Sequence, residues 1–246
     1  METIKIAHLY YDLMNLYGEH GNVRGLTHHL ESHGIRVIVH NLSIDDKIKF
    51  DDYDLFYIGS GSKESFLLAL NDLLKRKEDV IKAFNKNKFF VVTGNALDFF
   101  GESFTTVDNV KYEALGLFKY QSMETDFRIV GEQVFEAKDL KEEIIGFENR
   151  NSVLKNVHEK PLFTVKEGTG YAPNEITDGI LKKHFYGTYL LGPLFIRNPY
   201  FNEKIIKEIL KQRKLEYKPF QDDIEITAYN EYRKNLLNEN EDMEKE

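Results

Sequence analysis

The chain contains no cysteine among its 246 residues. This absence excludes disulfide bonds, zinc sites built from thiolates, and any reaction that starts from a cysteine nucleophile. No apolar run approaches the roughly 18 residues of a membrane-spanning helix, so we expect no membrane insertion. The first residues enter a strand-like run directly, without the basic and then apolar pattern of a signal peptide. These absences are typical of a cytoplasmic protein.

Basic residues are neither abundant nor concentrated. The sequence has 33 Lys and Arg against 41 Asp and Glu, and its net charge is -8 at pH 7. A nucleic-acid groove needs a concentrated basic face, so we expect no nucleic-acid partner. With 41% hydrophobic and 13% aromatic residues, the chain is long and apolar enough to bury a substantial core and to be globular.

Strands and helices are expected to alternate over the first hundred residues. Apolar and β-branched runs predict strands, and apolar residues spaced every three or four predict helices. The predicted strands are 4–10, 35–39, 55–58 and 89–92, and the predicted helices are 23–34, 64–74 and 79–84. This alternation indicates an α/β fold with a mostly parallel central sheet and flanking helices.

The second half of the chain does not continue this alternation, and short strands are predicted over most of it. Strands are predicted over 113–118, 127–136, 143–148, 162–165 and 185–191, with a helix after Pro199 and a last helix over 224–237. No internal repeat or low-complexity linker divides the sequence. We therefore predict a single domain over residues 1–237, with an additional strand-rich second half. An acidic, disordered tail is expected over 238–246.

Residues 88–101 form the most informative stretch. The apolar run 89–92 meets Thr93, Gly94 and Asn95, and an apolar segment follows at once. This pattern predicts a buried strand that turns sharply into a helix. In α/β enzymes such an elbow lifts a nucleophilic Ser or Cys above the carboxyl end of the sheet. Here the tip of the elbow is Gly94, so the expected nucleophile is absent.

A glycine-rich turn is expected to follow the strand 55–58. Gly59 and Gly61 there would let backbone N–H groups face a bound oxyanion or carbonyl oxygen. A plain tight turn with Ser62 as a helix cap explains the same residues about as well. The turn carries neither the dinucleotide-binding fingerprint nor the phosphate-loop lysine pattern. We therefore expect no nucleotide there, and we predict neither a cofactor nor a metal site for the chain.

A third turn, Gly192-Pro193, would follow the strand 185–191. It could aim Leu191 at the same edge of the sheet as Gly94. Leucine can pack there, but it cannot accept a proton. His184, the nearest histidine in sequence, stands ahead of the strand and beside two lysines, which favours a surface position.

In their order and spacing these segments resemble the class I glutamine amidotransferases, more closely their CobB/CobQ-like group, and most closely the GatD-type subunits. The matching segments are Leu13–Tyr17 with Gly21-Asn22, Phe56–Ser62, Gly146–Asn149 and Gly187–Pro193. The resemblance covers nearly the whole chain. It implies a flavodoxin-like fold and a glutamine or related small amide as ligand.

The resemblance also shows which reacting groups are missing. In that family the elbow reads Cys-Gly-Gly-x-Gln-x-x-Gly, and the histidine of a Gly-Thr-Tyr-x-His-Gly-Pro strand is the base. The cysteine position matches Gly94, the glutamine position Asp98 and the histidine position Leu191. The Gly-Phe-Glu-Asn-His run of the family ends here in Arg150. The candidate ligand-binding residues that remain are Gly59, Ser60, Gly61, Asn95 and Arg128, of which Arg128 matches a family arginine near the glutamine site.

The sequence leaves three hypotheses open. The first is a pseudoenzyme that binds or scaffolds a MurT-like Mur-ligase subunit and forms a heterodimer with it. The heterodimer would amidate a cell-wall precursor in peptidoglycan biosynthesis. The second is an active glutaminase or hydrolase with displaced residues, namely Ser60, Ser62 or Thr93 with His8, His20 or His184. The third, an altered copy of an active enzyme, is disfavoured because positions 95, 96 and 98 depart from the family pattern as well.

Overall fold

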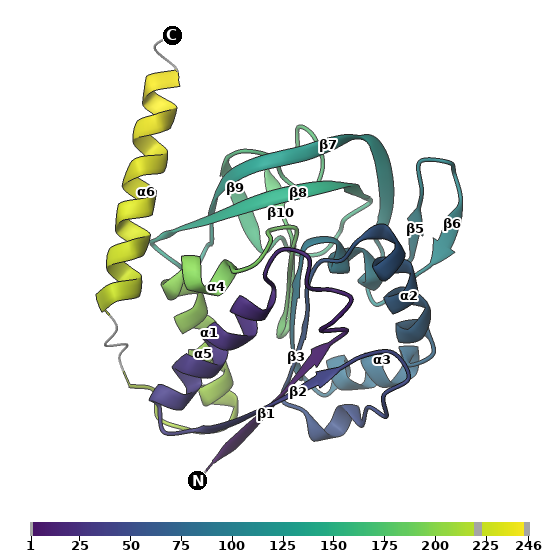
Figure 1. The fold of residues 1–246 in the computed structure, drawn as a ribbon, viewed down its shortest axis with the longest axis horizontal. Helices are drawn as coiled ribbons and strands as arrows, with labels where there is room; N and C mark the ends of the chain where they lie inside the picture. Colours follow the sequence, from purple (N-terminus) through teal and green to yellow (C-terminus); the bar gives the residue numbers. More distant parts are fainter. Residues whose placement is uncertain (1, 219–222, 244–246) are drawn as a thin grey trace.

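The computed structural model describes residues 2–218 and 223–243, which form two six-stranded sheets flanked by helices (Figure 1). The first sheet has the order β11-β12-β4-β3-β1-β2, and all neighbours in it are parallel except β11 and β12. Its strands are β1 (Thr3–Leu9), β2 (Arg36–Leu42), β3 (Leu55–Ile58), β4 (Phe89–Thr93), β11 (Ile180–Lys182) and β12 (Phe185–Thr188). The expected mostly parallel α/β sheet is confirmed, and its parallel strands follow the flavodoxin-like order.

Helices cover both faces of this sheet, and the strands alternate between the two resulting cores. Phe56 and Ile58 of β3 join the core under α2 (Lys63–Leu74) and α3 (Lys77–Asn85). Leu55 and Tyr57 join the core under α1 (His20–Ser32) and α5 (Pro199–Gln212). A strand that is buried on both faces reads as one continuous apolar run, which explains why β3 and β4 were predictable.

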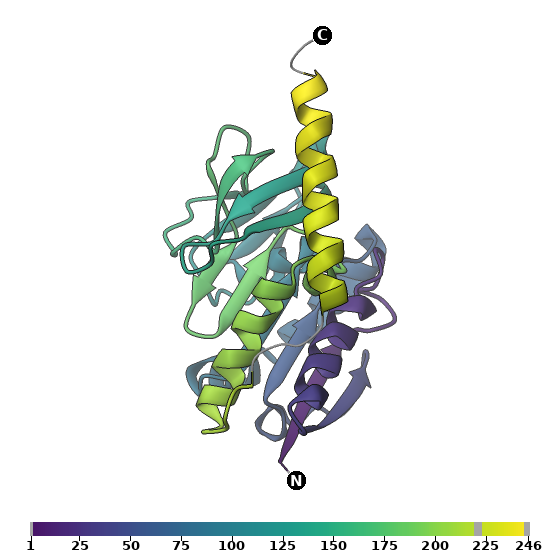
Figure 2. The ribbon, with the colours of Figure 1, turned by 90° about the vertical axis from the view of Figure 1, so that its left-hand side faces the viewer.

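The second sheet lies across the carboxyl end of the first (Figures 1 and 2). Its order is β10-β9-β7-β5-β6, and β8 also pairs with β7. The strands are β5 (Ser103–Thr105), β6 (Lys111–Glu113), β7 (Gln121–Glu136), β8 (Glu143–Lys155), β9 (Phe163–Glu167) and β10 (Thr177–Asp178). The long hairpin of β7 and β8 forms a roof over the ends of β3 and β4.

Several elements differ from the sequence-based expectation. Residues 114–118, where we predicted a strand, form a loop in which Ala114, Leu115 and Phe118 are buried. Its backbone N–H groups donate to carbonyl oxygens of residues 99–102 and not to a neighbouring strand. The helix predicted after β4 is a 3-10 helix, η2 (Gly94–Phe100). A second short 3-10 helix, η1 (Phe50–Asp52), and a four-residue helix, α4 (Leu194–Arg197), complete the connections.

The last helix, α6, is longer than predicted. It spans Asp223–Met243, so it covers the first six residues of the expected disordered tail, while residues 244–246 lie outside the described residues. Tyr229 and Leu236 pack with Val134 and Ile145 of the β7–β8 hairpin. His29 Nε2 lies 3.0 Å from the Glu225 carboxylate, which ties α6 to α1. The single domain over residues 1–237 stays a prediction, although both main cores contain residues of both sheets.

We expect the packing of β12 against η2 and the loop 114–118 to depend on Phe185. Its fully buried ring packs against Phe100 and Phe118, with centroids 4.9 and 4.7 Å away. We expect Phe185→Ala to lower the free energy of unfolding by about 3–5 kcal/mol, measured by urea denaturation. Phe127→Ala, at a ring that is 44% exposed, is the control and should cost less than about 1 kcal/mol. Equal losses in both variants would contradict this account of the core.

Candidate functional site

Gly94 stands at the tip of a sharp turn between β4 and η2. Its φ of +60° is a backbone conformation that glycine adopts without strain. The Gly94 N–H donates to the Leu190 carbonyl oxygen at 3.2 Å, so the turn is held against the segment after β12. A Cβ at this position would lie 1.6 Å from Ser60 Oγ and 3.0 Å from Leu191 Cδ2. The elbow is present as predicted, and the space where a side chain would start is already filled.

Ser60 and Leu191 are the two residues that close over this tip. Ser60 follows β3 and is 2% exposed, and its Oγ has no hydrogen-bond partner among residues 2–218 and 223–243. Leu191 is 5% exposed, and its N–H donates to the Phe147 carbonyl oxygen at 3.0 Å. The ends of β3, β4 and β12 therefore bring positions 60, 94 and 191 together. The side chains at these three positions contribute one hydroxyl and no base.

The other proposed hydroxyls are engaged elsewhere. Ser62 Oγ caps α2 by accepting the Ser65 N–H at 3.2 Å and also donates to the Glu64 carboxylate at 3.0 Å. Thr93 is fully buried beneath the tip. His184 stacks on Phe89 at the opposite end of β4, with ring centroids 4.3 Å apart. His184 therefore lies away from Ser60 and Ser62, and His8 and His20 line a different cavity from these two serines.

A buried carboxylate that the sequence did not reveal lies directly under the turn. Glu19, the residue before α1, is 0% exposed, and its Oε2 accepts from Tyr57 OH at 2.6 Å and Thr93 Oγ1 at 2.9 Å. Burial raises the pKa of Glu19, and these two hydrogen bonds partly offset the effect. A polar, glycine-containing loop gives no periodic signal, so nothing in the sequence marked Glu19 as buried.

Glycines at two of the three turns make room for this carboxylate. A Cβ on Gly59 would lie 2.4 Å from Glu19 Cγ, and a Cβ on Gly192 would lie 2.8 Å from Glu19 Oε2. Gly59, which we expected to face a ligand, therefore packs against Glu19.

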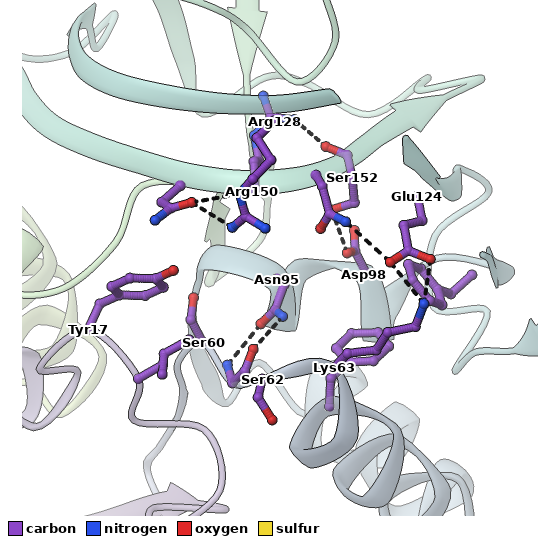
Figure 3. Close-up of a pocket in the computed structure, with 16 residues that line it drawn as sticks. Tyr17, Ser60, Ser62, Lys63, Asn95, Asp98, Glu124, Arg128, Arg150 and Ser152 are labelled. Carbon is purple, nitrogen blue, oxygen red and sulfur yellow. Dashed lines mark hydrogen bonds and ion pairs between the residues drawn. The ribbon is translucent and has the colours of Figure 1, made fainter. Parts of the chain in front are cut away.

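A cavity of about 340 Å³ opens beside Gly94, between this turn and the roof of β7 and β8. Figure 3 shows the β7 and β8 residues on one side and Ser60, Ser62 and Asn95 on the other. Four of the five predicted ligand-binding residues line it, namely Ser60, Gly61, Asn95 and Arg128. The Asn95 side-chain amide accepts from Gly61 N at 3.0 Å and donates to Gly61 O at 2.9 Å, which fixes that wall.

The rim of the cavity carries charges of both signs. Arg128 is exposed, and its guanidinium donates to Asn149 Oδ1 at 2.6 Å. Lys63 Nζ lies 2.8 Å from the Glu124 carboxylate. The Arg128 and Lys63 side chains are exposed, whereas the Glu124 side chain is only 9% exposed and also accepts from Val107 N and Asn151 Nδ2.

The floor of the cavity is a buried polar network around Asp98. The Asp98 carboxylate accepts from Tyr189 OH at 2.6 Å and Ser152 Oγ at 2.9 Å, and burial raises its pKa to about 6. Arg150 stacks over the Tyr189 ring at 4.1 Å and pairs with Glu148 at 2.8 Å. Both Asp98 and Arg150 stand at positions where the sequence departs from the family pattern.

Comparison with known proteins gives the class of this fold and site. Residues 5–199 match the family model of the CobB/CobQ-like glutamine amidotransferase domain. The chain therefore belongs to the CobB/CobQ-like glutamine amidotransferases, as the resemblance in the sequence predicted.

Two relatives from different organisms carry the same name. The chain is 26% identical over 228 residues to the lipid II isoglutaminyl synthase (glutamine-hydrolyzing) subunit GatD of Streptococcus pneumoniae, covering 92% of this chain and 85% of that one. It is 28% identical over 220 residues to the GatD subunit of Staphylococcus aureus, covering 89% of each.

Solved structures support the fold. A crystal structure of a glutamine amidotransferase superposes with a TM-score of 0.54 at 13% identity, covering 82% of this chain and 98% of that one. The glutaminase domain of Trypanosoma brucei CTPS with bound acivicin gives 0.53 at 8% identity, covering 89% and 96%. No helix in the described part of the chain is long and apolar enough to cross a membrane.

We expect a side chain at the elbow to be costly mainly because of Ser60. Gly94→Ala combines a left-handed backbone, which costs about 1–2 kcal/mol, with the overlap on Ser60. Gly18→Ala is the matched control, because Gly18 also has a positive φ, +76°, but no atom lies within 4 Å of the place that its Cβ would take. Gly94→Ala should therefore destabilise more than Gly18→Ala in chemical denaturation. Ser60→Gly should remove this excess in a double-mutant cycle, and an unchanged excess would contradict the steric account.

His8 should make the stability depend on pH. It is 1% exposed, and burial, with the nearby His20, lowers its pKa from 6.5 to about 4. Between about pH 6.5 and 4, His8 is therefore protonated in the unfolded chain and neutral in the folded chain. The free energy of unfolding consequently falls as the pH drops through this range. The full effect is about 3 kcal/mol.

We expect His8→Phe to flatten this acid loss relative to wild type, measured by urea denaturation at several pH values. The exposed His158, replaced as His158→Phe, should leave the pH profile unchanged. Parallel profiles for wild type and His8→Phe would show that His8 titrates normally in the folded chain.

Proposed function

We propose that this chain is a glutamine amidotransferase homologue without glutaminase activity of its own. In this proposal it binds or scaffolds a MurT-like Mur-ligase subunit, as a cytoplasmic heterodimer that amidates a cell-wall precursor. The support for the pathway is that both GatD relatives are named as subunits of lipid II isoglutaminyl synthase and are matched over 85% and 89% of their length.

The residues at the tip of the elbow are the main support for the proposal that hydrolysis is lost. The nucleophile position is Gly94, the space for its side chain is taken by Ser60, and the base position is the apolar Leu191. Loss of a single nucleophile or base in a catalytic triad typically lowers the rate by about 10⁴- to 10⁶-fold. Here both positions lack a reacting group, and Ser60 has no base beside it to activate its hydroxyl.

The cavity next to the turn supports a retained binding role. Its walls keep the Asn95 side-chain amide, which the Gly61 backbone holds in place, and the Arg128 guanidinium lies on the rim. These groups suit a small zwitterion with an amide side chain, such as glutamine. In our proposal the ligand is held there without being cleaved.

One observation favours the second candidate, an active glutaminase or hydrolase with displaced residues. Thr93 Oγ1 lies 2.9 Å from the Glu19 carboxylate, which is the contact that a hydroxyl nucleophile and its base would make. Both residues are fully buried, however, and neither lines the cavity. A substrate would have to displace the turn to reach them, so we prefer the non-hydrolysing role.

The decisive experiment measures release of glutamate from glutamine together with association. We expect the chain to co-purify from its native source in a stoichiometric complex with a Mur-ligase-type protein identified by mass spectrometry. We expect no glutamate release above background from the chain alone or from the complex. Recovery of the chain without a partner would count against the scaffolding role.

Variants separate the two candidates if glutamate release is observed. Loss of that activity in Thr93→Val would establish the displaced chemistry, since Val keeps the shape of Thr and removes the hydroxyl. Ser62→Ala removes the candidate hydroxyl that caps α2, and we expect it to retain the activity. Activity that survives Thr93→Val, Ser60→Ala and Ser62→Ala would point to a contaminating glutaminase.

A further inference from the structure

A second cavity, which we call the α1–β2 groove, lies on the side of the parallel sheet. It has a volume of about 380 Å³ and is lined by His8, His20, Val23, Arg24, Thr27 and Val39, among others. α1 runs beside the edge strand β2, and His8 lies on β1 (Figures 1 and 2). The groove shares no lining residue with the cavity beside Gly94.

Two buried polar atoms of the groove lack partners. His8 is 1% exposed and its Nε2 has no hydrogen-bond partner, and the same holds for the buried Oγ1 atom of Thr27, within residues 2–218 and 223–243. Leaving such a group buried without a hydrogen bond is unfavourable. A ligand that offered one hydrogen bond to each atom would recover part of this cost.

The His8 ring is held in position before any ligand arrives. It packs edge-on against Tyr57 on one side and His20 on the other, with ring centroids 5.2 and 5.0 Å away. Burial lowers the pKa of His8 to about 4, so the ring is neutral at physiological pH. A neutral imidazole whose orientation is fixed can accept a hydrogen bond from a hydroxyl without first being reorganised.

The rest of the groove has apolar walls, and Arg24 and Glu31 are exposed at its rim. Val23 and Val39 form apolar walls. Arg24 is exposed at the rim, and its guanidinium makes no ion pair or hydrogen bond within the described ranges. Glu31 lies about two helical turns further along α1, which leaves Arg24 available to a carboxylate.

We propose that the α1–β2 groove is a second ligand site, which binds a small organic acid with an apolar body and a hydroxyl group. The carboxylate pairs with Arg24, and the body packs between Val23 and Val39. The hydroxyl donates to His8 Nε2 and accepts from Thr27 Oγ1. The site is independent of the proposed function, because it uses none of the residues around Gly94.

The test titrates the full chain with 4-hydroxyphenylacetate, followed by calorimetry and by the NMR signals of the His8 ring. We expect saturable one-to-one binding with a dissociation constant of about 1 mM or lower. Arg24→Met should weaken it by about tenfold, through loss of a charge-assisted hydrogen bond. Thr27→Val, which keeps the side-chain shape, should weaken it by about three- to tenfold. Arg128→Met, at the rim of the other cavity, is the control and should bind as wild type does.

Analogues test the two polar contacts without changing the protein. Phenylacetate lacks the hydroxyl and 2-(4-hydroxyphenyl)ethanol lacks the carboxylate, so we expect both to bind more weakly. Three results would overturn the proposal: no saturation at about tenfold above the expected constant, equal affinity for Arg24→Met and wild type, or loss of binding in Arg128→Met. The last result would place the acid beside Gly94, and thermal melting of each variant would exclude unfolding as the cause.

Discussion

The buried Glu19 carboxylate holds the ends of several elements in one place. It receives hydrogen bonds from Tyr57 of β3 and Thr93 of β4. Asn22 of α1 donates to Tyr57 OH at 2.7 Å and accepts from Phe195 N of α4 at 3.0 Å, which extends the network to the turn after β12. Removing one member of such a network leaves the others buried and unsatisfied. The geometry of the elbow therefore rests on groups beneath it and not on any group at its tip.

This arrangement explains how the turn can persist without a reactive group. Gly94 adopts without strain a backbone conformation that is unfavourable for most other residues, and Ser60 and Leu191 fill the space above it. The turn is thus stabilised by the hydrogen bonds of Glu19 on one side and by the packing of Ser60 and Leu191 on the other. Neither contribution needs a nucleophile at position 94, so the turn does not depend on one.

The sequence predicts those parts of the fold and site whose residues form a local pattern, and it misses those that depend on distant partners. The strands β3 and β4 were predictable because burial on both faces gives a continuous apolar run. The meeting of Ser60, Gly94 and Leu191 also followed from the sequence, since carboxyl ends of parallel strands share one edge. The first six residues of β7 are largely polar, and only their pairing with β5 and β8 makes them a strand. Glu19 was missed for the same reason, because its burial depends on partners 38 and 74 residues away.

The floor of the cavity adds an argument about what kind of site this is. Arg150 is 3% exposed, and its charge lowers the pKa of three buried carboxyl groups, Glu148, Asp98 and Asp178, each of which is raised overall by burial. A buried charge of this kind is stable only while its partners remain, and removing one partner typically costs about 3–5 kcal/mol. Tyr189 links Asp98 and Arg150, because its hydroxyl donates to the Asp98 carboxylate and its ring lies under the Arg150 guanidinium. These buried contacts hold the floor of the cavity in place, whereas the Arg128 and Lys63 side chains at the rim are exposed.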